Sequence, residues 1–219
     1  MSYHPNNVSP GSLIEYLHDN QPVLGFVQEE QGRQFRILNT NKRQLKLTLP
    51  RILPWIGPKF PGNLSRSEIL EKLQLHHARR QEIQQSIDPA SIWEISAEEV
   101  SEATVTWFAG LIWNEPNDDQ IAALGRTLLE NKALFKFHPP HFRVFDPETV
   151  QAKLAEQETQ QRKRLLLAQG QSFLHALWQR LQVEDTTPFP ELPEDVEADL
   201  KTILLTGIRD PEDREFAAT

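Results

Sequence analysis

The chain has 219 residues, of which 38% are hydrophobic, and a formal net charge of −8, values that suit a folded protein with modest cores. The absence of cysteine excludes disulfides, zinc–thiolate sites and thiol nucleophiles and favours a cytoplasmic protein, and the absence of any run of about 20 apolar residues argues against a membrane span. The charge is uneven, because residues 1–60 carry seven basic and four acidic side chains (net +3) and the rest carries 16 and 27 (net −11).

Short β-strands are predicted in the first part of the chain, after a polar segment that ends at Pro10-Gly11. Turn-forming residues separate short apolar runs, and the last of these places leucine at every second position. Because a lone meander cannot bury its apolar face, the strands predict a small SH3-like β-barrel over residues 10–60. The predicted strands are Leu13–Leu17, Val23–Glu29, Gln34–Leu38 and Gln44–Leu49.

A proline-rich segment then closes the predicted barrel, with Trp55 as a lid over its end. The apolar neighbours Ile52, Leu53 and Ile56 favour burial of this indole. The alternative role for Trp55 is to stack on a nucleic-acid base.

A polar linker helix is predicted over residues 64–87, and we place a domain boundary just before it, at residues 61–64. Its apolar positions are sparse, so we expect the helix to lie across other elements.

A third unit, residues 88–146, is predicted to contain three helices and a β-hairpin. The first helix is short and follows the N-cap candidate Asp88, the second begins at the capping-box sequence Ser96–Glu99, and the third begins near Asn117. Two aromatic strands around Pro139-Pro140 form the predicted hairpin. This order is typical of a winged-helix, or helix-turn-helix, unit.

Long helices are predicted for residues 147–210. Asp146 and Pro147 mark the start of a helix that continues to about Gln182, and a loop rich in proline and acidic residues separates it from a last helix over residues 196–207. The predicted fold class of the whole chain is therefore α+β.

No catalytic constellation is evident, because the sequence lacks the nucleophile-elbow, phosphate-loop, dinucleotide and zinc-protease motifs. The histidine groupings His138 with His141 and His76 with His77 have no cysteine or clustered aspartate nearby, so we predict no metal site. The many carboxylates occur at helix starts and in polar loops, where capping and solubility explain them better than acid–base chemistry does. We assign no catalytic residue.

The strongest functional signal is a group of basic side chains in and beside the predicted third and fourth strands. Arg36 and Lys46 are expected to point outward from neighbouring strands, with Lys42-Arg43 at the joining turn, which would form a patch for phosphates. The alternative is a solvated strand face that blunts an edge against aggregation. The predicted nucleic-acid contacts are Arg33, Arg36, Lys42, Arg43, Lys46 and Arg51.

The third helix of the predicted winged-helix unit is a poor reader of DNA sequence. It carries Arg126, but acidic residues at both of its ends weaken its attraction for phosphates. Basic residues on the predicted hairpin are expected to add to the attraction for phosphates. The predicted secondary nucleic-acid contacts are Arg126, Lys132, Lys136 and Arg143.

Two stretches of the chain resemble a known family. The segments Gly11–Tyr16 (GSLIEY) and Pro22–Val27 (PVLGFV) match the pattern G-S-L-[IV]-E-[FY] … P-x-L-G-x-V, which is similar to the opening of ribonuclease II-like (RNB-family) exoribonucleases. The later stretch SIWEISAEEVSEATVTWFAG … ALFKFHPPHFRVFDPETVQAKLAEQ looks like the helix-turn-helix segment of that family, where a hairpin leads into a long polar helix. The resemblance covers roughly residues 10–210.

The resemblance implies a non-catalytic N-terminal region that guides single-stranded RNA to the catalytic module of a 3′–5′ exoribonuclease, present in cis or in trans. The family holds Mg²⁺ with clustered aspartates in that module, and no such cluster occurs in these 219 residues. We therefore expect this chain to need no cofactor, to bind no membrane and to leave RNA uncleaved.

Two alternatives stay open. A protein-interaction scaffold would use the long polar helix 148–182 and the acidic winged-helix unit. A winged-helix DNA-binding regulator would prefer duplex DNA and bind as a dimer to paired half-sites.

Overall fold

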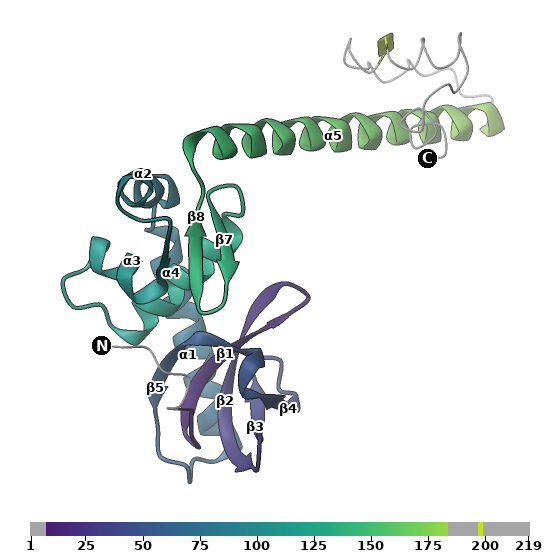
Figure 1. The fold of residues 1–219 in the computed structure, drawn as a ribbon. Coiled ribbons are helices and arrows are strands. Elements are labelled where there is room, and N and C mark those ends of the chain that lie inside the picture. Colours follow the sequence, from purple (N-terminus) through teal and green to yellow (C-terminus); the bar gives the residue numbers. More distant parts are fainter. Residues whose placement is uncertain (1–7, 184–196, 199–219) are drawn as a thin grey trace. The chain divides into compact units, whose positions relative to one another are not determined.

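The computed structural model describes residues 8–183 together with Glu197 and Ala198 (Figure 1). It is a mixed α+β protein, as predicted. The chain divides into two compact units, the first ending at Val150 and the second starting at Gln151. The predicted last helix, residues 196–207, lies almost wholly outside the described residues.

The first five strands form one antiparallel sheet in the order β4-β3-β2-β1-β5. The sheet is not closed into a barrel, so the prediction of a closed barrel over residues 10–60 is wrong. The segment with Trp55 is a full strand rather than a lid, and its prolines, which lack an N–H for a further ladder, suit the edge position of that strand. The strands are β1 (Ser12–His18), β2 (Gln21–Gln31), β3 (Gln34–Asn39), β4 (Gln44–Thr48) and β5 (Ile52–Lys59), with a 3-10 helix over Leu49–Arg51.

Both faces of this sheet bury apolar side chains, because strand alternation sends successive residues to opposite sides. One face is built around Ile14, Ile37 and Leu47. The other face is covered by helix α1 (Arg66–Gln85), whose Ile69 and Leu73 are buried against it. A capping box formed by Ser65 and Glu68 starts α1. The packing of α1 across the strands agrees with the prediction that this helix lies across other elements.

A second group of elements follows α1. Helix α2 runs unbroken from Pro89 to Glu99, so the predicted second helix at Ser96 is wrong: Ser96 is buried in α2. The third predicted helix and the hairpin lie where expected, and strand β6 joins the hairpin in a three-stranded sheet of order β6-β8-β7. The elements are α2 (Pro89–Glu99), β6 (Glu102–Thr104), α3 (Val105–Ile112), α4 (Asp118–Glu130), β7 (Phe135–His138) and β8 (His141–Val144).

The two groups of elements share a core, although we predicted a boundary between them. Trp55 of β5 is 1% exposed and lies among the buried side chains of α3, α4 and the hairpin, with its ring stacked on that of Phe142. Gly125 of α4 makes room for it, because an added Cβ there would lie 2.8 Å from the indole ring. Residues 8–150 therefore form one compact unit.

Helix α5 (Pro147–Val183) follows, and Asp146 caps it by accepting hydrogen bonds from Thr149. Its start agrees with the sequence prediction, and its described part extends to Val183. Nowhere in residues 8–183 is a helix both long enough and apolar enough to cross a bilayer.

Candidate nucleic-acid interface and a buried charge network

The six primary basic residues predicted from the sequence are all exposed, and the sheet pairs two of them. Arg36 of β3 and Lys46 of β4 are direct cross-strand partners, so their side chains leave the same face of the sheet side by side. We call Arg33, Arg36, Lys42, Arg43, Lys46 and Arg51 the basic stripe.

The other four residues of the basic stripe lie at the two ends of strands β3 and β4. Arg33 precedes β3 and Arg51 lies just after β4, at the end where Gln34 pairs with Thr48. Lys42 and Arg43 form the turn at the opposite end. With a rise of about 3.3 Å per residue, the six residues of β3 give the basic stripe a length of about 20 Å.

One carboxylate lies within the basic stripe. Glu29 of β2 is the register partner of Arg36, and its Oε2 lies 2.7 Å from Arg36 Nη2. Both side chains are 44% exposed, so the pair is weak and solvent-screened. Arg36 is therefore shared between Glu29 and any phosphate that approaches.

The secondary contacts divide into an exposed set and a buried residue. Lys136 and Arg143 are cross-strand partners on the hairpin, and Lys132 is exposed at the turn before it. Arg126 is only 4% exposed and forms an ion pair with Glu15. Its prediction as a nucleic-acid contact is therefore wrong, because a buried guanidinium already committed to a carboxylate cannot reach a phosphate.

Carboxylates also surround Arg143. It lines an open pocket of about 380 Å³ together with Glu98, Glu99 and Asp146. Negative charge on this rim opposes an anionic ligand near Arg143.

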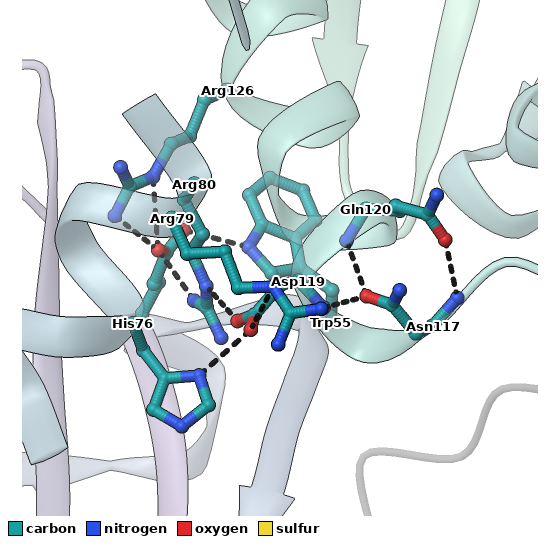
Figure 2. Close-up of polar contacts among 9 residues, drawn as sticks. Trp55, His76, Arg79, Arg80, Asn117, Asp119, Gln120 and Arg126 are labelled. Atoms are coloured by element: carbon teal, nitrogen blue, oxygen red, sulfur yellow. Dashed lines mark hydrogen bonds and ion pairs between the residues drawn. The ribbon is translucent and has the colours of Figure 1, made fainter. Parts of the chain in front are cut away.

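The most highly organised polar cluster is buried between the sheet and the helices (Figure 2). Glu15 of β1 is completely buried and accepts hydrogen bonds from Arg80 Nη1 at 2.7 Å, from Arg126 Nε at 2.9 Å and from Trp55 Nε1 at 2.8 Å. These donors come from α1, α4 and β5. One carboxylate thereby joins four elements.

Asp119 at the start of α4 extends this buried charge network. Its Oδ1 accepts from Arg80 Nε at 2.8 Å and its Oδ2 from His76 Nδ1 at 2.7 Å, and Figure 2 shows these donors converging on it from α1. Asp119 is one of the carboxylates at helix starts for which the sequence predicts a role in capping or solubility. It is instead 4% exposed, and N-capping of α4 is done by Asn117.

The charges of the buried network stabilise one another. Burial would raise the pKa of Glu15, but the adjacent Arg80 and Arg126 outweigh it and hold the pKa below its ordinary value. Burial likewise opposes the charge on Arg80, and Glu15 and Asp119 outweigh it, so the pKa of Arg80 is raised. Two carboxylates thus balance two guanidinium groups.

The space around Arg80 is as closely matched as its charge. The side chain is fully buried, and its Nη2 has no hydrogen-bond partner. An added Cβ on Gly57 would lie 2.5 Å from this nitrogen and 2.9 Å from Leu13 Cβ. Glycine at position 57 is therefore what admits the guanidinium between β5 and α1.

This network has the geometry of a structural anchor rather than of an active site. Both oxygens of Glu15 and both of Asp119 already accept hydrogen bonds from other side chains, so each carboxylate oxygen is engaged within the network. Among the described residues, no group of three histidine, aspartate or glutamate side chains is arranged to hold a metal ion.

His77 lies beside this network, in surroundings that disfavour its protonated form. Its half-buried position, and secondly the charge of Arg126, lower the pKa of His77 from 6.5, and its Nδ1 has no hydrogen-bond partner. Because the folded pKa is below the unfolded one, the unfolded state binds more protons as the pH falls below about 6.5. The free energy of unfolding therefore decreases as the pH falls from about 6.5 to the pKa of His77 in the folded state.

We expect His77→Gln to flatten this part of the pH dependence. Urea unfolding at pH 7.5, 6.5 and 5.5 measures it, as the difference between the parent chain and the variant. An equal loss of stability in both proteins would show that protonation of His77 is not the cause.

The comparisons with known proteins add no relative: no family model, curated protein or solved structure matches this chain. The basic stripe was predicted from the sequence, and the buried network was not. The available signal was a glutamate inside the apolar run Leu13-Ile14-Glu15-Tyr16, because a charge in a buried strand requires a buried partner.

Proposed function

We propose that this chain is a non-catalytic RNA-binding region that guides single-stranded RNA to the catalytic module of an RNB-type 3′–5′ exoribonuclease. That module, in cis or in trans, would hold the Mg²⁺ and perform the cleavage in the cytoplasm. The observation that carries the proposal is the alignment of Arg36 with Lys46 in the middle of the basic stripe. A cross-strand pair of cations with further cations at both ends of the two strands suits a phosphate backbone.

The proposed fold assignments are an SH3-like unit followed by a winged helix. Pairing of β1 with both β2 and β5, and a 3-10 helix before the last strand, support an SH3-like sheet that is left open. The order α2-β6-α3-α4-β7-β8, with β8 central in its sheet, supports a winged helix. The middle of α4, which would read duplex DNA in such a unit, is buried, so we do not propose a sequence-specific regulator.

Reversing the two central charges tests the proposal. Arg36→Glu combined with Lys46→Glu should remove two phosphate contacts. This lowers the slope of log affinity against log salt by about 1.4 and raises the Kd at 0.1 M salt by at least about 25-fold. The measurement is fluorescence anisotropy of a labelled 16-nucleotide single-stranded RNA across a salt series. A gel with Mg²⁺ present should show the RNA intact.

The control is Glu29→Gln, which releases Arg36 from its carboxylate and should lower the Kd by up to about fivefold. Circular dichroism checks that both proteins are folded. Salt-insensitive binding, or no binding by the parent chain at low salt, would refute the RNA-binding proposal.

A protein-interaction scaffold is the second candidate. Leu154, Leu165 and Trp178 on α5 are each about half exposed or more, and exposed apolar side chains of this size suit a protein partner. This function predicts partner binding that is unchanged by the reversal of Arg36 and Lys46.

A further inference from the structure

The sheet that carries the basic stripe offers no platform for stacking bases. Its aromatic side chains are all 6% exposed or less. Trp55 is used in the shared core, and Phe35 packs on the opposite face with Ile37. Stacking on aromatic rings is the usual way in which a protein holds the bases of a single strand. The aromatic side chains of the five strands are Tyr16, Phe26, Phe35 and Trp55.

The amide side chains near the basic stripe are fewer than its cations. Gln44 donates from Nε2 to Gln28 Oε1 at 2.9 Å, so this pair is engaged with itself, and the exposed amides beside the stripe are Gln31, Gln34 and Asn41. With the aromatic rings buried, the charged groups are the main chemistry that the surface offers to a ligand.

A further cation extends the basic stripe beyond the sheet. Arg66, the first residue of α1, is exposed, and its Nη2 donates to the backbone oxygen of Lys42 at 2.8 Å. That bond holds the guanidinium beside the turn that carries Lys42 and Arg43. Arg66 was not predicted from the sequence, because it lies 23 residues after Arg43 on a different element.

We infer that the basic stripe, extended by Arg66, is a track for a phosphodiester backbone that is indifferent to the bases and to the sugar. This inference rests on the proposed RNA-binding function. It defines the ligand class as single-stranded nucleic acids, RNA and DNA alike. The extended stripe carries seven cations, so it can neutralise at most seven phosphates. The salt slope should therefore not exceed about 5 in magnitude, since each phosphate on a single strand contributes about 0.7.

Three labelled 16-mers test this inference in anisotropy titrations of the full chain: oligo(U), the deoxy oligomer of the same base, and an abasic oligomer with the same phosphates. We expect Kd values within about threefold of one another and the same salt slope. Tighter binding of the RNA by tenfold or more over the abasic oligomer would overturn the inference and leave RNA binding intact. Failure of all three oligomers to bind would overturn the proposed function as well.

Arg66→Gln tests the extension, with Arg79→Gln as the matched control on the same helix. Loss of one phosphate contact should raise the Kd of all three oligomers about fivefold at 0.1 M salt and lower the slope by about 0.7. Arg79, whose side chain is 58% exposed and 3.9 Å from Asp119, should change neither quantity. Equal effects of the two substitutions, or none from Arg66→Gln, would exclude Arg66 from the track.

Discussion

Replacing Glu15 by glutamine is expected to lower the free energy of unfolding by about 3–5 kcal/mol. The substitution keeps the size of the side chain and removes the charge that neutralises Arg80 and Arg126, both of which are buried. An uncompensated buried guanidinium is far more costly than the loss of one hydrogen bond. Urea unfolding at pH 7.5, followed by circular dichroism at 222 nm, measures the change.

Glu29→Gln is the matched control for this experiment. It removes the same charge from the neighbouring strand, where the ion pair with Arg36 is solvent-exposed, and it should change the free energy of unfolding by less than about 1 kcal/mol. Similar effects of the two substitutions would mean that the buried network does not hold the sheet to the helices.

Replacing Trp55 by alanine should also lower the free energy of unfolding by about 3–5 kcal/mol. The side chain fills the contact between β5 and α4 against Gly125, and its Nε1 donates to Glu15. Its loss leaves a cavity and takes one donor from the buried carboxylate. The measurement is again urea unfolding, read by circular dichroism because the substitution removes a fluorophore.

Trp178→Ala provides the comparison, since this indole on α5 is 63% exposed. Its removal should change the free energy of unfolding by no more than about 0.5 kcal/mol. If Trp55→Ala were equally mild, the sheet and the helices would have to unfold independently, as the predicted domain boundary implies. Because Trp55 and Glu15 are in contact, the effects of their substitutions should not add.

Local structure could be predicted from the sequence because its signals are local. The leucine alternation of β4, the capping residues Asn117 and Asp146, and the aromatic pairs on either side of Pro139-Pro140 each specify an element through neighbours only a few residues away. The same holds for the centre of the basic stripe, since a hairpin register brings Arg36 and Lys46 together over ten residues of sequence. The prediction of a second helix starting at Ser96 was wrong because the Ser96–Glu99 pattern also fits a position inside a longer helix.

Only the tertiary structure decided which charged residues are exposed and which are buried. Arg126 and Arg66 are the same residue type and both lie on helices, yet the first is bound to Glu15 across 111 positions of sequence and the second lies exposed beside Lys42. The predicted boundary at residues 61–64 failed for the same reason. Composition marks a linker, but the burial of Trp55 against α4 depends on a packing partner 70 residues away. Long-range pairing of charge and shape leaves no periodic trace in the sequence.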